Sequence, residues 1–102
     1  MDLNKPHRDE RLTIAALAAQ LGEQEYRLRR LINGRLGYRN FPAFLNSFRL
    51  AEVKAALADP AQAEVPILTI ALDAGFGSLG PFNRAFREDE GMTPSSWRAT
   101  HG

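Results

Sequence analysis

Arginine side chains concentrate in the middle of this 102-residue chain and have its clearest chemical potential. Residues 26–54 hold seven basic residues against one acidic residue, although the whole chain has a formal net charge of only +1. The seven are Arg27, Arg29, Arg30, Arg35, Arg39, Arg49 and Lys54. A guanidinium is a planar fork of donors that matches phosphates and guanine edges. The cluster therefore indicates either a nucleic-acid contact or a solvated basic face, and charge alone leaves both open.

Other chemistries have little support. The chain has no cysteine, and its two histidines, His7 and His101, lie near the termini, which excludes disulfide frameworks and Cys/His zinc sites. No nucleophile–base pair or glycine-rich phosphate loop is present in the sequence, no cofactor is implied, and we expect no enzymatic activity. No apolar run approaches the roughly 18 residues of a membrane helix, so we expect a cytoplasmic chain. Because both histidines lie near the termini, we expect them in disordered tails.

Apolar residues at helical spacing predict a first pair of helices. The stripe of the first helix comprises Ile14, Leu17, Ala18 and Leu21. Thr13 can cap this helix and Gly22 can end it. The stripe of the second helix comprises Leu28, Leu31 and Ile32, which leaves its arginines on other faces. Asn33-Gly34 and Gly37 are expected to end this second helix.

A long helix over residues 41–59 is expected to join this pair to another one. Asn40 can cap the long helix, and Asp59-Pro60 ends it. The second pair begins at Pro66 and turns at Gly75. Further caps and stops are expected at Ser78, Gly91 and Thr93. Seven aromatic residues are expected in the core: Phe41, Phe44, Phe48, Phe76, Phe82, Phe86 and Trp97.

The two helix pairs repeat one another. Ala18 and Gly22 in the first pair match Ala71 and Gly75 in the second, at an offset of 53 residues. Each pair reads as helix, glycine turn and helix, the layout of a helix-turn-helix, whose second helix enters the major groove of DNA. We therefore expect an all-α fold that binds double-stranded DNA. The alternative is a helical protein-interaction module that uses the basic and apolar faces.

A motif in the second half of the chain resembles that of a known family. Between residues 67 and 98, Ile-Ala is followed by Gly-Phe, Phe-x-Arg-x-Phe, Gly-x-Thr-Pro and an aromatic residue with Arg. This order resembles the signature of the AraC/XylS transcription regulators, and residues 12–57 are similar to that family too. The resemblance implies a tail or linker over 1–11 and a DNA-binding domain over 12–102. Its parts would be helix-turn-helix units at 12–40 and 66–98, joined by the long helix over 41–59.

The resemblance also implies which side chains contact DNA. The outward residues of the first recognition helix read bases in that family, and the matching positions here are Tyr26, Arg27, Arg29 and Arg30. Arg27 and Arg30 share a face, where each could bond guanine in a bidentate pair. Arg29 could instead face solvent or phosphate, and Tyr26 could be a partial core residue. Arg39 joins these candidates.

The second recognition helix departs from the usual polar pattern of the family. Leu79, Gly80 and Pro81 occupy matching positions but cannot form side-chain hydrogen bonds. Because residues 55–102 have three arginines against six acidic residues, we expect the first unit to supply most of the affinity. An ion pair with Glu88 is the alternative role for Arg84. The remaining candidates for DNA contact are Asn83, Arg84 and Arg87.

Partners follow from the same resemblance. Most such regulators carry an N-terminal sensor or dimerisation domain, although a small standalone regulator is also consistent with the sequence. Residues 25–30, 36–41 and 65–68 further resemble a subgroup with a membrane-embedded N-terminal half. The acidic run 88–90 is either a solvated face, the preferred interpretation, or a contact for RNA polymerase. Arg49 is a candidate phosphate contact. We expect the isolated domain to be a monomer, because its own packing uses its apolar stripes.

Overall fold

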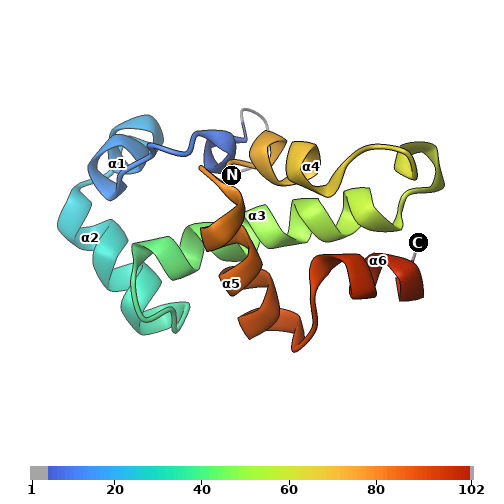
Figure 1. Ribbon diagram of the computed structural model, residues 1–102. Helices are drawn as coiled ribbons and strands as arrows, with labels where there is room; N and C mark the ends of the chain where they lie inside the picture. Colours follow the sequence, from blue (N-terminus) through green and yellow to red (C-terminus); the bar gives the residue numbers. More distant parts are fainter. Residues whose placement is uncertain (1–4, 102) are drawn as a thin grey trace.

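The computed structural model describes residues 5–101, and these residues form helices and turns without any strand (Figure 1). The α-helices are α1 (Ile14–Leu21), α2 (Glu25–Arg30), α3 (Phe41–Ala58), α4 (Ile67–Asp73), α5 (Leu79–Glu90) and α6 (Pro94–His101). Two 3-10 turns, η1 (Pro6–Arg8) and η3 (Pro60–Gln62), and a π-helical turn, η2 (Leu31–Arg35), complete the elements. The prediction of an all-α fold with a long central helix is confirmed.

Local capping explains where several helices begin and end. The side chains of Thr13 and Asn40 accept hydrogen bonds of 3.1 and 2.9 Å from the backbone N–H three residues further on. Gly22 and Gly91 end α1 and α5 with φ values of 67° and 74°, a left-handed conformation that favours glycine. These four predicted boundaries are confirmed.

Other local predictions are wrong or only partly right. Asn33-Gly34 does not end the second helix but lies inside η2, whose wider hydrogen-bond spacing carries the chain on to a left-handed turn at Gly37. Leu21, at the last position of α1, is 56% exposed rather than part of the core. Ser78 occupies the N-cap position of α5, but its side chain forms no capping hydrogen bond.

The core consists of two clusters, and α3 contributes to both. The first cluster contains Leu12, Leu17, Ala18, Leu28, Ile32, Phe44 and Leu45. The second contains Leu50, Val53, Leu57, Ile70, Ala71, Ala74, Phe76, Phe82, Phe86 and Trp97. The matched alanines of the repeat, Ala18 and Ala71, are both buried, and Phe41 and Phe48 pack against the first cluster. Each helix pair therefore has its own core, as the repeat predicts.

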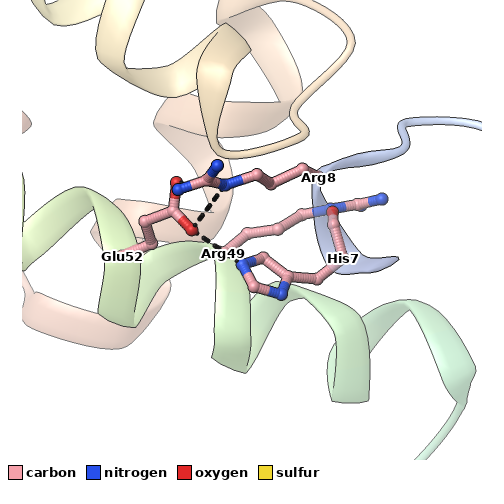
Figure 2. Close-up of polar contacts among 4 residues, drawn as sticks. All are labelled: His7, Arg8, Arg49 and Glu52. Carbon is pink, nitrogen blue, oxygen red and sulfur yellow. Dashed lines mark hydrogen bonds and ion pairs between the residues drawn. The ribbon is translucent and has the colours of Figure 1, made fainter. Parts of the chain in front are cut away.

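The segment before α1 packs across α3. The imidazole of His7 is buried, with Nε2 2.9 Å from Oε1 of Glu52, and Nε of Arg8 donates to both oxygens of the same carboxylate (Figure 2). Arg49 of α3 donates to the carbonyls of His7 and Asp9 at 2.7 and 2.9 Å. We call His7, Arg8, Arg49 and Glu52 the clamp. The prediction that His7 belongs to a disordered tail is wrong, because these contacts fix it.

The last helix is tied to the turn that follows α3. Arg98 donates to the backbone carbonyls of Val65, at 2.8 Å, and Gln62. The ring of His101 stacks on Trp97 with 4.1 Å between the ring centroids. His101 is therefore part of α6, and its prediction as a disordered tail residue is also wrong.

The acidic run 88–90 does more than solvate a helix face. Nζ of Lys54 on α3 lies 2.9 Å from Asp89 and 3.0 Å from Glu90. Hydrogen bonds to Asp89, which has the larger effect, and to Glu90 raise the pKa of Lys54. Glu90 also accepts a hydrogen bond from the indole of Trp97 at 2.9 Å. The preferred interpretation as a plain solvated face is therefore wrong for Asp89 and Glu90, which join α5 to α3 and α6.

Candidate nucleic-acid interface

Helix α2 presents a basic and aromatic surface. Leu28 is its only buried residue, because this side chain packs into the first core cluster. Tyr26 is 53% exposed, so its interpretation as a partial core residue is wrong. The guanidinium groups of Arg27 and Arg30 each lie 5.9 Å from the centre of the Tyr26 ring, and Arg27 also donates to the tyrosine hydroxyl at 3.2 Å. Two cations therefore lie near one exposed ring.

Ion pairs distinguish the three arginines of α2. Arg29 lies 2.8 Å from Glu25, and Arg27 lies 3.9 Å from Glu23. Exposed pairs at this spacing contribute only about 0.2–0.5 kcal/mol, so a phosphate could displace them. Arg30 has no acidic partner among residues 5–101. Arg30 can therefore bind a base or a phosphate without breaking an ion pair.

Helix α5 combines an apolar first turn with later basic residues. Leu79 is 44% exposed, and Gly80 and Pro81 next to it are exposed too. Arg84 and Arg87 are exposed and form no ion pair with other described residues. The alternative role of Arg84, an ion pair with Glu88, is therefore wrong. The remaining candidate of this helix, the half-buried Asn83, lies one turn after Leu79.

Glu88 instead faces the loop that precedes α3. Nη2 of Arg39 lies 3.8 Å from Oε2 of Glu88, and both side chains are more than 70% exposed. A pair this exposed contributes little stability. It places Arg39 of the first unit beside α5 of the second.

The sequence of this chain matches a known family over most of its length. Residues 17–100 match an AraC-type family that is described as a helix-turn-helix domain. This chain belongs to the AraC-type helix-turn-helix family. The Right origin-binding protein of Escherichia coli K12 is 33% identical to it over 92 residues, which are 90% of this chain and 30% of that protein. The transcriptional regulator Rob of Salmonella typhimurium matches to the same extent. The chain thus spans about 30% of the length of these relatives.

Solved structures have the same fold. An AraC-type transcriptional regulator from Chromobacterium violaceum superimposes with a TM-score of 0.80, at 24% identity, over 97% of this chain and 86% of that one. The C-terminal domain of AraT, a response regulator from Geobacillus stearothermophilus, gives a TM-score of 0.76 at 28% identity, over 92% and 74% of the two chains. This AraC-type chain is a sequence-specific DNA-binding domain of a bacterial transcription regulator.

Arg49 lies outside the exposed surface of this AraC-type domain. It is 8% exposed, its donors bond backbone carbonyls, and its guanidinium lies 5.9 Å from the Phe76 ring centre. Burial lowers the pKa of Arg49, against the opposing effect of nearby acidic groups. The candidate role as a phosphate contact is therefore wrong. The sequence position of Arg49 predicts its burial, because it lies four residues after Leu45 and four before Val53, on the core stripe of α3.

Proposed function

We propose that α2 and α5 are the recognition helices of this AraC-type domain and enter successive major-groove segments on one face of duplex DNA. The exposed arginine face of α2 is the observation that carries the proposal. The molecule extends 42 Å along its longest axis, which is enough to reach over one duplex turn of about 34 Å. In Figure 1, α2 and α5 lie at separate points along α3 and are inclined in a similar direction.

In the first unit, Arg30 and Arg27 act as the base-reading residues. They share a face of α2, and an arginine that bonds O6 and N7 of guanine distinguishes this base from the others. Tyr26, whose ring lies near both guanidinium groups, packs on a thymine methyl group or bonds a phosphate. Arg29, which is paired with Glu25 at 2.8 Å, serves as a phosphate contact.

In the second unit, the first turn of α5 lies against the base edges, and the later cationic side chains hold the DNA backbone. Arg84 and Arg87 are free of ion pairs with the described residues, and Asn83 lies on the same helix. Arg39 exchanges its exposed pair with Glu88 for a phosphate. Because the first unit has more exposed arginines, it supplies most of the affinity.

Selection of bound duplexes from a random library at about 150 mM salt tests the proposal, since this condition suppresses non-specific electrostatic binding. We expect a site with two blocks about 10 bp apart. A single short block would contradict base reading by α5. No enrichment would contradict the proposal as a whole and favour a helical protein-interaction module.

We also propose a wider setting for the domain. The domain is cytoplasmic and has no catalytic activity. When isolated it is a monomer, since its two apolar clusters are internal. Residues 5–11 belong with the folded domain rather than with a linker, because the clamp holds them on α3. No helix within residues 5–101 is long and apolar enough to cross a bilayer. Light scattering after size-exclusion chromatography tests the monomer, with a dimer mass as the contradicting result.

The parent protein is a further part of this proposal. We propose that it carries an additional N-terminal sensor or membrane domain, as the family resemblance implies. The chain spans about 30% of its relatives' length, which is consistent with a further domain. We also propose that RNA polymerase contacts the second unit near the exposed Glu88. A Glu88→Lys variant that binds its site normally but fails to change transcription in a purified system would support this contact. Unchanged transcription would contradict it.

A further inference from the structure

Leu79 is an apolar side chain placed where a recognition helix meets DNA. It is the first residue of α5, directly after the N-cap Ser78, and 44% of it is exposed. The two residues that follow, Gly80 and Pro81, bring no polar side chain to this turn. The second core cluster is complete without Leu79, because Phe82 and its aromatic neighbours fill it. Core packing therefore does not explain a leucine at this position.

The surroundings of Leu79 suit a partner that is apolar in part and negatively charged. Leu79, Asn83 and Arg87 follow one another at four-residue steps, so they share one face of α5. This face borders a groove of about 440 Å³ that α4 and α6 complete, with Leu68 among its apolar residues and no acidic residue in its lining. Arg87 is the cation of the groove. A base edge beside a phosphate backbone has this combination of properties.

A second cation, Arg84, also reaches the first turn of α5. Nη1 of Arg84 lies 3.8 Å from the position that a Cβ atom on Gly80 would occupy. The guanidinium thus folds back over the glycine, beside the turn that begins with Leu79. Hydrogen-bond donors and leucine methyl groups therefore occur together at the start of α5.

We infer that Leu79 reads the 5-methyl group of a thymine in the major-groove segment that α5 enters. This inference rests on the proposed function and deepens it. The first residues of a recognition helix contact base edges, and thymine alone among the four bases presents a methyl group there. The second unit therefore selects a base by apolar contact instead of by side-chain hydrogen bonds. Arg84 and Arg87 hold the flanking phosphates.

Replacement of thymine by deoxyuridine tests the inference, since it removes one methyl group and leaves base pairing intact. Each thymine of the selected site is replaced in turn, and fluorescence anisotropy at constant salt gives the dissociation constant. We expect one thymine in the second block at which uracil weakens wild-type binding by about two- to fourfold, the effect of withdrawing one methyl group from apolar contact. Leu79→Ala should bind the thymine and uracil duplexes equally.

Leu68→Ala is the matched control, because Leu68 is exposed to the same degree, at 43%, and borders the same groove. It should keep the preference for thymine. If uracil anywhere in the second block left wild-type binding unchanged, the inference would be overturned while DNA binding stayed intact. A selected site with only one block would have the same meaning. A preference for thymine that survives in Leu79→Ala would overturn it too. Failure to bind any duplex would instead contradict the proposed function.

Discussion

Arg29 and Arg30 are chemically identical neighbours on α2 with different surroundings. Arg29 is paired with Glu25 at 2.8 Å, whereas Arg30 forms no ion pair with the described residues and lies 5.9 Å from the centre of the Tyr26 ring. We expect Arg30→Ala to weaken binding to the selected site by about 1–3 kcal/mol and to relax the preference at one base pair. Arg29→Ala should weaken all sequences alike. Binding isotherms on cognate and random duplexes measure both effects, and an equal loss on the two duplexes for Arg30→Ala would contradict base reading.

Arg49 has a structural role instead of a DNA-binding one. Its buried guanidinium donates to the carbonyls of His7 and Asp9. We expect Arg49→Ala to lower the free energy of unfolding by roughly 2–4 kcal/mol, because two charged hydrogen bonds are lost and the carbonyls lose their donors. Urea denaturation measures this loss. The exposed Arg87→Ala should stay within about 0.5 kcal/mol of wild type. A stable Arg49→Ala protein with weakened DNA binding would reverse the assignment.

The carboxylate of Glu52 makes the clamp sensitive to acid. Burial alone would raise the pKa of Glu52, but hydrogen bonds from Arg8 and His7 outweigh this effect and lower the pKa below its ordinary value of 4.5. A carboxylate whose pKa is lowered by folding stabilises the folded state at pH values above its ordinary pKa. This stabilisation is lost as the pH falls through the lowered pKa. We therefore expect Glu52→Gln to flatten the loss of stability that wild type shows on acidification below pH 4.5.

Urea midpoints between neutral pH and about pH 3 measure this effect, because the contribution of a lowered carboxylate pKa is lost across that window. Glu64→Gln is the control, since Glu64 is exposed and forms no ion pair with other described residues. Its curve should follow that of wild type. Parallel curves for Glu52→Gln and wild type would show that the clamp carboxylate does not contribute to acid sensitivity.

At the scale of elements, the two glycine turns are equivalent in sequence and different in space. Gly22 has a φ of 67° and nothing within 4 Å of a Cβ, whereas Gly75 has a φ of 112° and a Cβ there would lie 2.1 Å from the carbonyl oxygen of His7. We expect Gly22→Ala to cost about 1 kcal/mol, from the left-handed backbone alone. Gly75→Ala should cost about 3 kcal/mol or more, because it also displaces the clamp segment. Thermal unfolding compares them, and equal costs would contradict the close packing at Gly75.

The elements also show which parts of the structure follow from local sequence. Thr13, Asn40 and Gly91 act through hydrogen bonds or dihedral angles within a few residues, so their effects can be predicted without the fold. The contact of His7 with Glu52 joins residues 45 positions apart, and no periodicity encodes it. Helical periodicity predicted that the arginines of α2 lie off its core face, and they are exposed. Their contact with DNA was implied by the family resemblance and stays a prediction. Their ion-pair partners depend on side-chain placement.

At the scale of the whole molecule, two core clusters predict two partly independent units. We expect Leu17→Ala, in the first cluster, to reduce hydrogen-exchange protection mainly in α1 and α2. Phe82→Ala, in the second cluster, should act mainly on α4 to α6. Mass spectrometry of exchanged peptides measures both patterns. Uniform loss of protection in either variant would show that the molecule opens as a single unit.

The clamp also sets how the molecule would bear mechanical tension. Its hydrogen bonds hold residues 7–9 to residues 49–52, so the first helix-turn-helix forms a loop pinned at its base. A pull between residue 5 and residue 101 would run through the clamp, the second half of α3 and the second unit. The first recognition helix would carry no load until the clamp opens, so strain applied along the chain would reach α5 before α2.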